Sequence, residues 1–214
     1  MKEDVLFDIV LNASSISISD IVNKCMNEPL VYWEIEQILS AYDRKKRFEL
    51  FIALNDSVLH NDKFLAFKAF REAYCSSDNI YEKIKSSPIC FDLKSFIKNV
   101  DNKNGGVKST MNPTEEKFYD ELKNCFTIYR GISVTEHESK DYGVSWSLSK
   151  KEAENYLNFS ANNINGEGGI LSKSINKEDV ITIFSVCETL NGDAKNEIIY
   201  INHGEQPTFE KINN

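Results

Sequence analysis

The stretch NCFTIYRGIS, residues 124–133, predicts the strand around which the C-terminal half of the chain is organised. Residues 126–129 carry aromatic and β-branched side chains, which are enriched in β-strands. Arg130 follows this run and Gly131 comes directly after it, so the pattern predicts a buried strand that ends at Arg130 and turns at the glycine. An arginine in this place either terminates the strand or holds an anion.

A helix is expected immediately before this strand. Asn112 is a typical N-cap residue, and Pro113 suits the first helical position. Glu115 and Glu116 then place negative charge at the positive end of the helix dipole. The pattern predicts a helix from Pro113 to about Lys123.

Short β-type runs separated by turns follow Arg130. One helix interrupts them, because Ser149 and Glu152 have the spacing of a capping box. The segment VTEHESKDYG, residues 134–143, is expected to be a loop. The four further expected strands are GVSWSLS, ITIFSV, EIIYI and TFEKI.

The first half of the chain has apolar residues at helical spacing in three segments. Such stripes are far more often part of a hydrophobic core than of a cofactor site, and we interpret them as core. The second segment is expected to begin with Asp43 as its N-cap. The stripes consist of Trp33, Ile35, Ile38, Leu39 and Tyr42, then Phe48, Phe51 and Ile52, then Phe64, Phe67, Phe70 and Tyr74.

A polar, glycine-containing segment separates the two halves. DNKNGGVKSTMNP, residues 101–113, has no apolar periodicity and is the expected linker. The sequence thus predicts an α+β protein, with a helical N-terminal region at 1–100 and a β-rich unit at 114–214.

Composition argues against several classes of protein. The chain of 214 residues has a formal net charge of −8, whereas a protein that coats DNA or RNA needs a basic face. Its five cysteines are widely spaced and form no CxxC pair, so we expect reduced, mostly buried thiols rather than disulfides or a zinc site. No export signal or membrane span is visible, so we expect a cytoplasmic protein without a membrane partner.

Two further features recur at the expected strand ends. In GVSWSLS, Ser145 and Ser147 alternate with apolar residues, so the two hydroxyls share one face of a strand. Glu197 opens the strand EIIYI. Taken singly, Arg130, the serine pair and Glu197 are each more often a strand end or a solvated face than a functional site.

Taken together and in this order, the three features resemble the R-S-E group of ADP-ribosyltransferases. The resemblance extends from Phe126 to the C-terminus and implies a split β-sandwich behind the helical N-terminal region. Members of the group are often toxins, effectors, or phage and defence proteins. The matching segments are IYRG at 128–131, GVSWSLSKKEA at 143–153, GGILSKSINKEDVITIF at 168–184 and NEIIYI at 196–201.

The resemblance implies transfer of ADP-ribose from NAD to a macromolecular acceptor, protein or nucleic acid, without a metal. Glu197 would stabilise the positive charge that develops on the ribose as nicotinamide leaves. Arg130 would grip a phosphate or ribose oxygen through its planar fork, and Ser145 would orient Glu197. The expected NAD-contacting residues are Arg130, Gly131, Ser145, Trp146 and Ser147. For two of them a structural role is the alternative: Trp146 could belong to the hydrophobic core, and Ser147 could support the strand or the following helix.

The sequence departs from the group at one position. Many members that modify arginine or asparagine carry a glutamate or glutamine two residues before the catalytic glutamate, whereas this chain has Lys195. A cation cannot accept a proton from an attacking guanidinium, so another amino acid, a nucleic acid or water is an alternative acceptor. Asp193 or Glu188 could supply the second carboxylate if the loop ETLNGDAKN folds over the acceptor.

Three alternatives are open. The first is a NAD glycohydrolase, and the second is a non-catalytic protein that uses the same scaffold as a decoy, inhibitor or immunity factor. The third is a transferase that holds nucleic acid through Lys150, Lys151 and Lys195. A cognate inhibitor or antitoxin is a further expected partner. His137 is expected in an exposed loop, and NGEGG, residues 165–169, as a surface turn or an edge over the nicotinamide.

Overall fold

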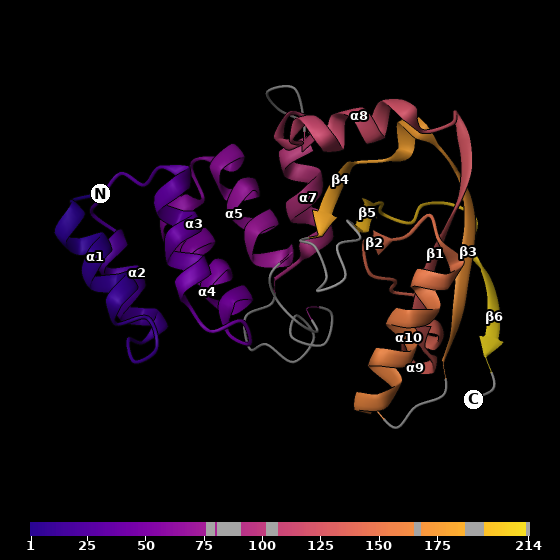
Figure 1. Ribbon diagram of the computed structural model, residues 1–214, viewed down its shortest axis with the longest axis horizontal. Helices are drawn as coiled ribbons and strands as arrows, with labels where there is room; N and C mark the ends of the chain where they lie inside the picture. The colour runs from indigo at the N-terminus through magenta and orange to yellow at the C-terminus, as the bar shows by residue number, and fades with distance from the viewer. Residues whose placement is uncertain (76–79, 81–90, 102–106, 165–167, 187–194, 213–214) are drawn as a thin grey trace. The chain divides into compact units, whose positions relative to one another are not determined.

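The computed structural model describes residues 1–75, 80, 91–101, 107–164, 168–186 and 195–212. The chain divides into two compact units, Met1–Thr110 and Met111–Asn214. The division falls inside the stretch 101–113 that the sequence predicts as a linker. The first unit is helical and the second contains two small antiparallel sheets, so the protein is α+β (Figure 1).

The N-terminal unit is organised around an aromatic core. Phe48 and Phe51 of α4 and Phe67 and Phe70 of α5 are fully buried, which confirms the core prediction for the second segment and for the middle of the third. Their rings meet at tilted or edge-on angles, for example Phe48 and Phe70 at 70°. The elements are α1 (Glu3–Leu11), α2 (Ile18–Cys25), α3 (Tyr32–Ala41), α4 (Arg47–Leu54), a π-helical turn η1 (Asn55–Leu59), α5 (Lys63–Cys75), α7 (Leu93–Asp101) and a 3₁₀ turn η2 (Val107–Thr110).

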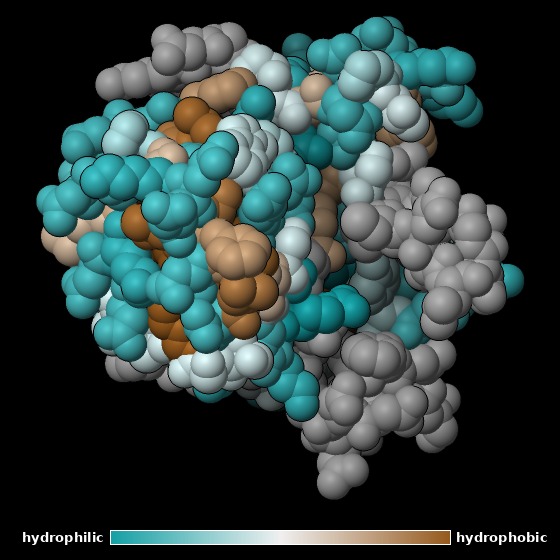
Figure 2. All heavy atoms as spheres, turned by 60° about the vertical axis from the view of Figure 1, so that its left-hand side comes forward, coloured by the Kyte–Doolittle hydropathy of each residue, from teal (hydrophilic) through white to brown (hydrophobic). Residues whose placement is uncertain are grey.

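Three expectations for this unit are wrong. Trp33 and Phe64 are 50% and 37% exposed, and each is the second residue of its helix, where the tilt of the Cα–Cβ bond toward the N-terminus carries a side chain toward the end of the helix. Asp43 does not cap α4; its carboxylate accepts a bond from the backbone of Lys45, in a turn that precedes the helix. Figure 2 shows brown hydrophobic areas among polar ones on the face of the molecule that it presents.

The C-terminal unit consists of two three-stranded sheets with strand orders β1-β3-β6 and β2-β5-β4, all pairs antiparallel. An isolated bridge between Tyr129 and Ser147 joins β1 to β2 and therefore links the two sheets. The elements are α8 (Pro113–Glu121), β1 (Cys125–Ser133), α9 (Val134–Ser139), β2 (Ser145–Trp146), α10 (Lys150–Ile164), β3 (Gly168–Asn176), a 3₁₀ turn η3 (Lys177–Asp179), β4 (Thr182–Val186), β5 (Lys195–Ile199) and β6 (Thr208–Ile212).

The alternation of β1 places Arg130 on the core side of its sheet. Ile128 and Ile132 belong to a hydrophobic cluster that both sheets share, and Arg130 lies between them on the same face. Tyr129 packs on the opposite side, against the cluster below α10. The strand continues to Ser133, so the prediction that it ends at Arg130 is wrong.

Gly131 lies within β1 and does not form a turn. A Cβ atom there would lie 2.2 Å from the backbone oxygen of Ala153 in α10. Glycine is therefore required because helix and strand approach closely, not because the backbone reverses. Helix α10 packs against β1 and β3 here (Figure 1).

Other boundaries differ from the sequence expectations. Residues 168–176 form β3, the middle strand of the first sheet, so the described glycines of the expected turn 165–169 are strand residues. Residues 134–139 form α9 rather than a loop, because Ser133 caps them through the backbone N–H of Glu136. The predicted cap of α8 by Asn112, with Pro113 in first position, is confirmed, and the helix ends at Glu121.

The described cysteines form no disulfide with one another. Cys25 is buried, Cys75 is half-buried and Cys125 is exposed, whereas Cys90 and Cys187 lie outside the described residues. Among the helices that the structure describes, none is long and apolar enough to cross a membrane.

Candidate active site

The register of the second sheet brings Ser145 and Glu197 together. Ser145 pairs with Ile199, so Glu197 is its diagonal neighbour on the same face of β5. Trp146 and Ile198 point to the opposite face, into the shared core. The Ser145 hydroxyl donates a 2.8 Å hydrogen bond to Oε2 of Glu197.

Helix α10 supplies a second donor to the same carboxylate. The Tyr156 hydroxyl donates to Oε1 of Glu197 over 3.0 Å, so each oxygen of Glu197 has its own donor. One helical turn earlier, Glu152 accepts a hydrogen bond from the Ser147 hydroxyl. Residues four apart lie on one face of a helix, so α10 contacts both the serine segment and Glu197 with one face.

Burial is the largest influence on the ionisation of Glu197. The residue is half-buried, and Phe184 lies directly across from it in β4, itself fully buried. Desolvation raises the pKa of the Glu197 carboxyl above its ordinary value, and the charge of Glu152 acts in the same direction. The hydrogen bonds from Ser145 and Tyr156 and the charge of Arg130 lower the pKa but do not cancel the effect of burial.

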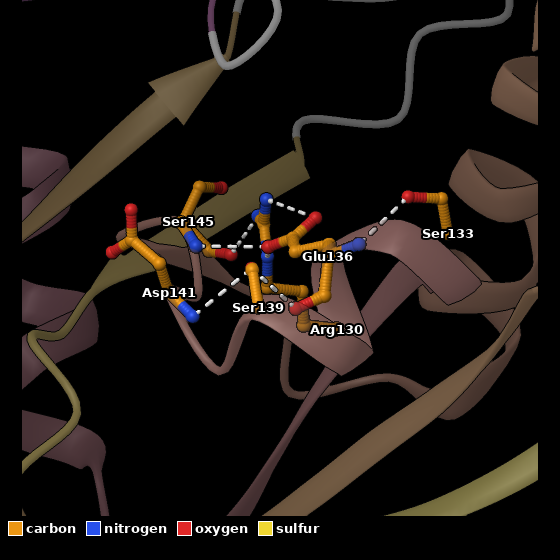
Figure 3. A network of polar contacts seen from close by, with 7 residues as sticks. Arg130, Ser133, Glu136, Ser139, Asp141 and Ser145 are labelled. Atoms are coloured by element: carbon orange, nitrogen blue, oxygen red, sulfur yellow. Dashed lines mark hydrogen bonds and ion pairs between the residues drawn. The ribbon is translucent and has the colours of Figure 1, made fainter. Parts of the chain in front are cut away.

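Arg130 is held by an ion pair inside the unit (Figure 3). Its Nε and Nη2 donate to the two carboxylate oxygens of Glu136 over 2.9 and 3.4 Å. The side chains of Arg130 and Glu136 are only 16% and 6% exposed, and charges buried to this extent need a partner. Oε1 of Glu136 also accepts from the backbone of Gly143, where an added Cβ would lie 2.3 Å from Nη2 of Arg130.

Ser145 connects Arg130 to Glu197. Nη1 of Arg130 donates to the backbone oxygen of Ser145 over 2.7 Å, while the hydroxyl of the same serine donates to Glu197. Three residues that are distant in the sequence therefore form one chain of contacts at the junction of the two sheets. Figure 3 shows the arginine end of this chain, with Ser133 and Ser139 holding α9 around Glu136.

Other residues that the sequence predicted for the site make contacts that support the fold. Trp146 is 1% exposed and lies in the core, and Gly131 faces α10. Ser147 is buried, and besides its bond to Glu152 it accepts one from the backbone of Ser149. His137 stacks on Phe209 with ring centroids 3.8 Å apart, so its expected place in an exposed loop is wrong.

The acceptor-side residues are described only in part. Asp193 and Glu188 lie outside the described residues, and of Lys195 only the backbone, at the start of β5, is described. Lys150, one of three lysines considered for nucleic-acid contacts, forms a 2.7 Å ion pair with Glu210. Across the described part of the chain, no group of histidine, cysteine and acidic residues could hold a metal ion.

Two residues of this network were not predicted from the sequence. Glu136 lies in a segment that was expected to be a loop, and no spacing rule links it to Arg130. Tyr156 had a weak signal, because it follows Glu152 by four residues on a helix whose start was predicted.

Comparison of the chain with protein-family models gave no match, and no curated protein or solved structure matched it significantly.

Proposed function

We propose that the protein is an NAD-dependent mono-ADP-ribosyltransferase of the R-S-E type and that its C-terminal unit is the catalytic core. The observation that carries the proposal is the convergence of Arg130, Ser145 and Glu197 in one chain of hydrogen bonds. In this proposal the two sheets joined at Tyr129 and Ser147 correspond to the split β-sandwich of the group.

Glu197 has the chemistry that the first step requires. Cleavage of the nicotinamide–ribose bond sends the electron pair to nicotinamide and leaves positive charge on the ribose. A carboxylate fixed by Ser145 and Tyr156 is already oriented when that charge develops, so it stabilises the transition state without reorganising. Partial burial strengthens the interaction because less water screens it.

The surroundings of Arg130 favour a positioning role. Its guanidinium binds Glu136 and the backbone of Ser145, which keeps β1 and β2 in register beside Glu197. Its positive charge also lowers the pKa of the Glu197 carboxyl and so favours the ionised form. The resemblance implies a phosphate contact for Arg130 in addition to these bonds.

The proposal is tested with NAD labelled on its adenylate part. Purified protein is incubated with this NAD, alone and with cell lysate, and both nicotinamide release and label transfer are followed. We expect Glu197→Gln to bind NAD with unchanged affinity and to lose turnover by roughly 10² to 10³-fold, the usual loss for a key electrostatic group. Glu205→Gln, which changes an exposed glutamate of the same unit, is the matched control.

Each possible result of this experiment assigns the protein to one functional class. Label in a protease-sensitive or nuclease-sensitive fraction establishes a transferase and its acceptor. Nicotinamide release without transfer indicates a glycohydrolase. Equal activity of wild type and Glu197→Gln contradicts the role of Glu197, and the absence of both signals favours the non-catalytic binding protein.

A further inference from the structure

We propose that Tyr156 is the proton relay between the acceptor and Glu197, and that the acceptor is a hydroxyl group. The inference rests on the proposed function. Tyr156 joins two properties that no other described contact of Glu197 combines: its hydroxyl donates to Oε1 of Glu197, and its side chain is 41% exposed. A nucleophile that approaches from solvent can therefore meet the phenol.

The fold holds Tyr156 in this position. The bond between Glu152 and Ser147 fixes the first turn of α10 to the serine segment, and the close approach of Ala153 to Gly131 sets the height of the helix over β1. Tyr156 follows on the next turn of the same face. The packing of α10 against β1 and the serine segment therefore places Tyr156 beside Glu197.

The step balances with these groups alone. The acceptor oxygen forms the bond to the ribose carbon as nicotinamide leaves with the electron pair of the broken carbon–nitrogen bond. The acceptor proton passes to Oη of Tyr156, and the original Tyr156 proton passes to Oε1 of Glu197. Tyr156 ends neutral and Glu197 ends protonated, and Glu197 then releases the proton to water.

Among the residues that the structure describes, four groups act on the ionisation of the Glu197 carboxyl. Ser145 and Tyr156 donate to it, Arg130 lowers its pKa by its charge, and Glu152 raises it. Burial raises the pKa most, so the carboxylate is a better proton acceptor than an exposed glutamate. The Glu197 carboxylate, at the end of the relay, can therefore accept the proton that Tyr156 donates.

The chemistry of this relay selects the acceptor class. A neutral hydroxyl has a lone pair and loses its proton as the new bond forms, so a relay to a weak base is sufficient. A guanidinium cation has no available pair until a dedicated base removes a proton, and position 195, which holds that base in many related enzymes, is lysine here. Water and the hydroxyls of sugars or side chains are the acceptors that fit.

Tyr156→Phe tests the relay, because it removes the hydroxyl and keeps the ring. We expect nicotinamide release to fall by roughly 10²-fold, within the usual range for lost acid–base catalysis, with NAD affinity unchanged. Sodium azide is the decisive addition, since the azide anion attacks without losing a proton. It should restore nicotinamide release in Tyr156→Phe and give ADP-ribosyl azide, detected by mass spectrometry.

Tyr119→Phe is the matched control. The Tyr119 hydroxyl also donates a hydrogen bond within the C-terminal unit, to the backbone oxygen of Lys177, but it does not contact Glu197. This variant should have wild-type turnover with and without azide. A loss shared by both variants would reflect structural damage and overturn the relay.

A second measurement needs no substrate. Carbon-13 NMR of the labelled Glu197 carboxyl gives its pKa in the free protein. The bond from Tyr156 lowers this pKa, so Tyr156→Phe should raise it, while Tyr119→Phe should leave it unchanged.

The outcomes separate the two proposals. If wild type releases nicotinamide and Tyr156→Phe does so at the same rate, the relay is wrong and the enzyme assignment stands. A slow Tyr156→Phe that azide does not rescue reduces Tyr156 to a positioning residue, which also overturns the relay. If wild type releases no nicotinamide, the proposed function fails and the relay fails with it.

Discussion

Arg130 and Glu136 form a bidentate ion pair inside the C-terminal unit, in which Nε of Arg130 and Oε1 of Glu136 are 2.9 Å apart. The pair explains how an arginine can lie between Ile128 and Ile132 on the core face of a strand. It also fixes the bond from Arg130 to the backbone of Ser145, and hence the serine that orients Glu197. The stability of the unit and the geometry of the site are therefore linked through one carboxylate.

Glu136→Gln should destabilise the C-terminal unit by about 1–3 kcal/mol, because it leaves a largely buried guanidinium without its counter-charge. The measurement is urea unfolding followed by the fluorescence of Trp146, in a Trp33→Phe background that leaves this buried indole as the only tryptophan. Glu138→Gln changes an exposed residue of the same helix and should alter stability by less than about 0.5 kcal/mol. Equal unfolding midpoints for the two variants would contradict the role of the pair.

Glu115→Ala should also destabilise this unit by about 1–3 kcal/mol. The carboxylate is 1% exposed and accepts one hydrogen bond from the backbone of Asn112 and another from the backbone of Ser185. It therefore caps α8 and also attaches the helix to β4, the neighbour of the strand that carries Glu197. The neighbouring Glu116→Ala is the control, because Glu116 is exposed. The same fluorescence assay measures both, and a similar small effect of the two would show that Glu115 acts only as a helix-start charge.

Glu197→Gln should stabilise the protein at neutral pH. Burial raises the pKa of Glu197 in the folded state above about 4.3, the value of an unfolded chain. Its contribution to stability is therefore complete below that value and is lost as pH rises through the folded pKa. Glutamine does not titrate, so the difference in melting temperature should be small near pH 4 and grow in favour of the variant toward pH 7.

Melting curves of wild type and Glu197→Gln between pH 4 and pH 8 test this, with Glu205→Gln as the control for the loss of one negative charge. A difference that does not change with pH would mean that the carboxyl titrates as in an unfolded chain. A gain in stability together with a loss of turnover would identify Glu197 as a residue whose charge is retained at a cost in stability.

Local patterns in the sequence predicted much of the framework. The cap of α8 by Asn112, the bond that the backbone N–H of Glu152 donates to the Ser149 hydroxyl at the start of α10, and the buried aromatic residues of α4 all follow from spacing within a few residues. The α+β class follows from the change in periodicity after Arg130. These features need no knowledge of distant parts of the chain.

The contacts of the site were decided by the tertiary structure. The sequence contained Arg130, Ser145 and Glu197 in order, but strand register determined that the Ser145 hydroxyl meets Glu197, and helix docking determined that Tyr156 meets it too. The sequence indicated a strand end at Arg130 because the ion pair with Glu136, which lets the charged side chain lie within the sheet, depends on the tertiary structure. Caps and alternation act between near neighbours along the chain, whereas partners across sheets are set by packing of the whole unit.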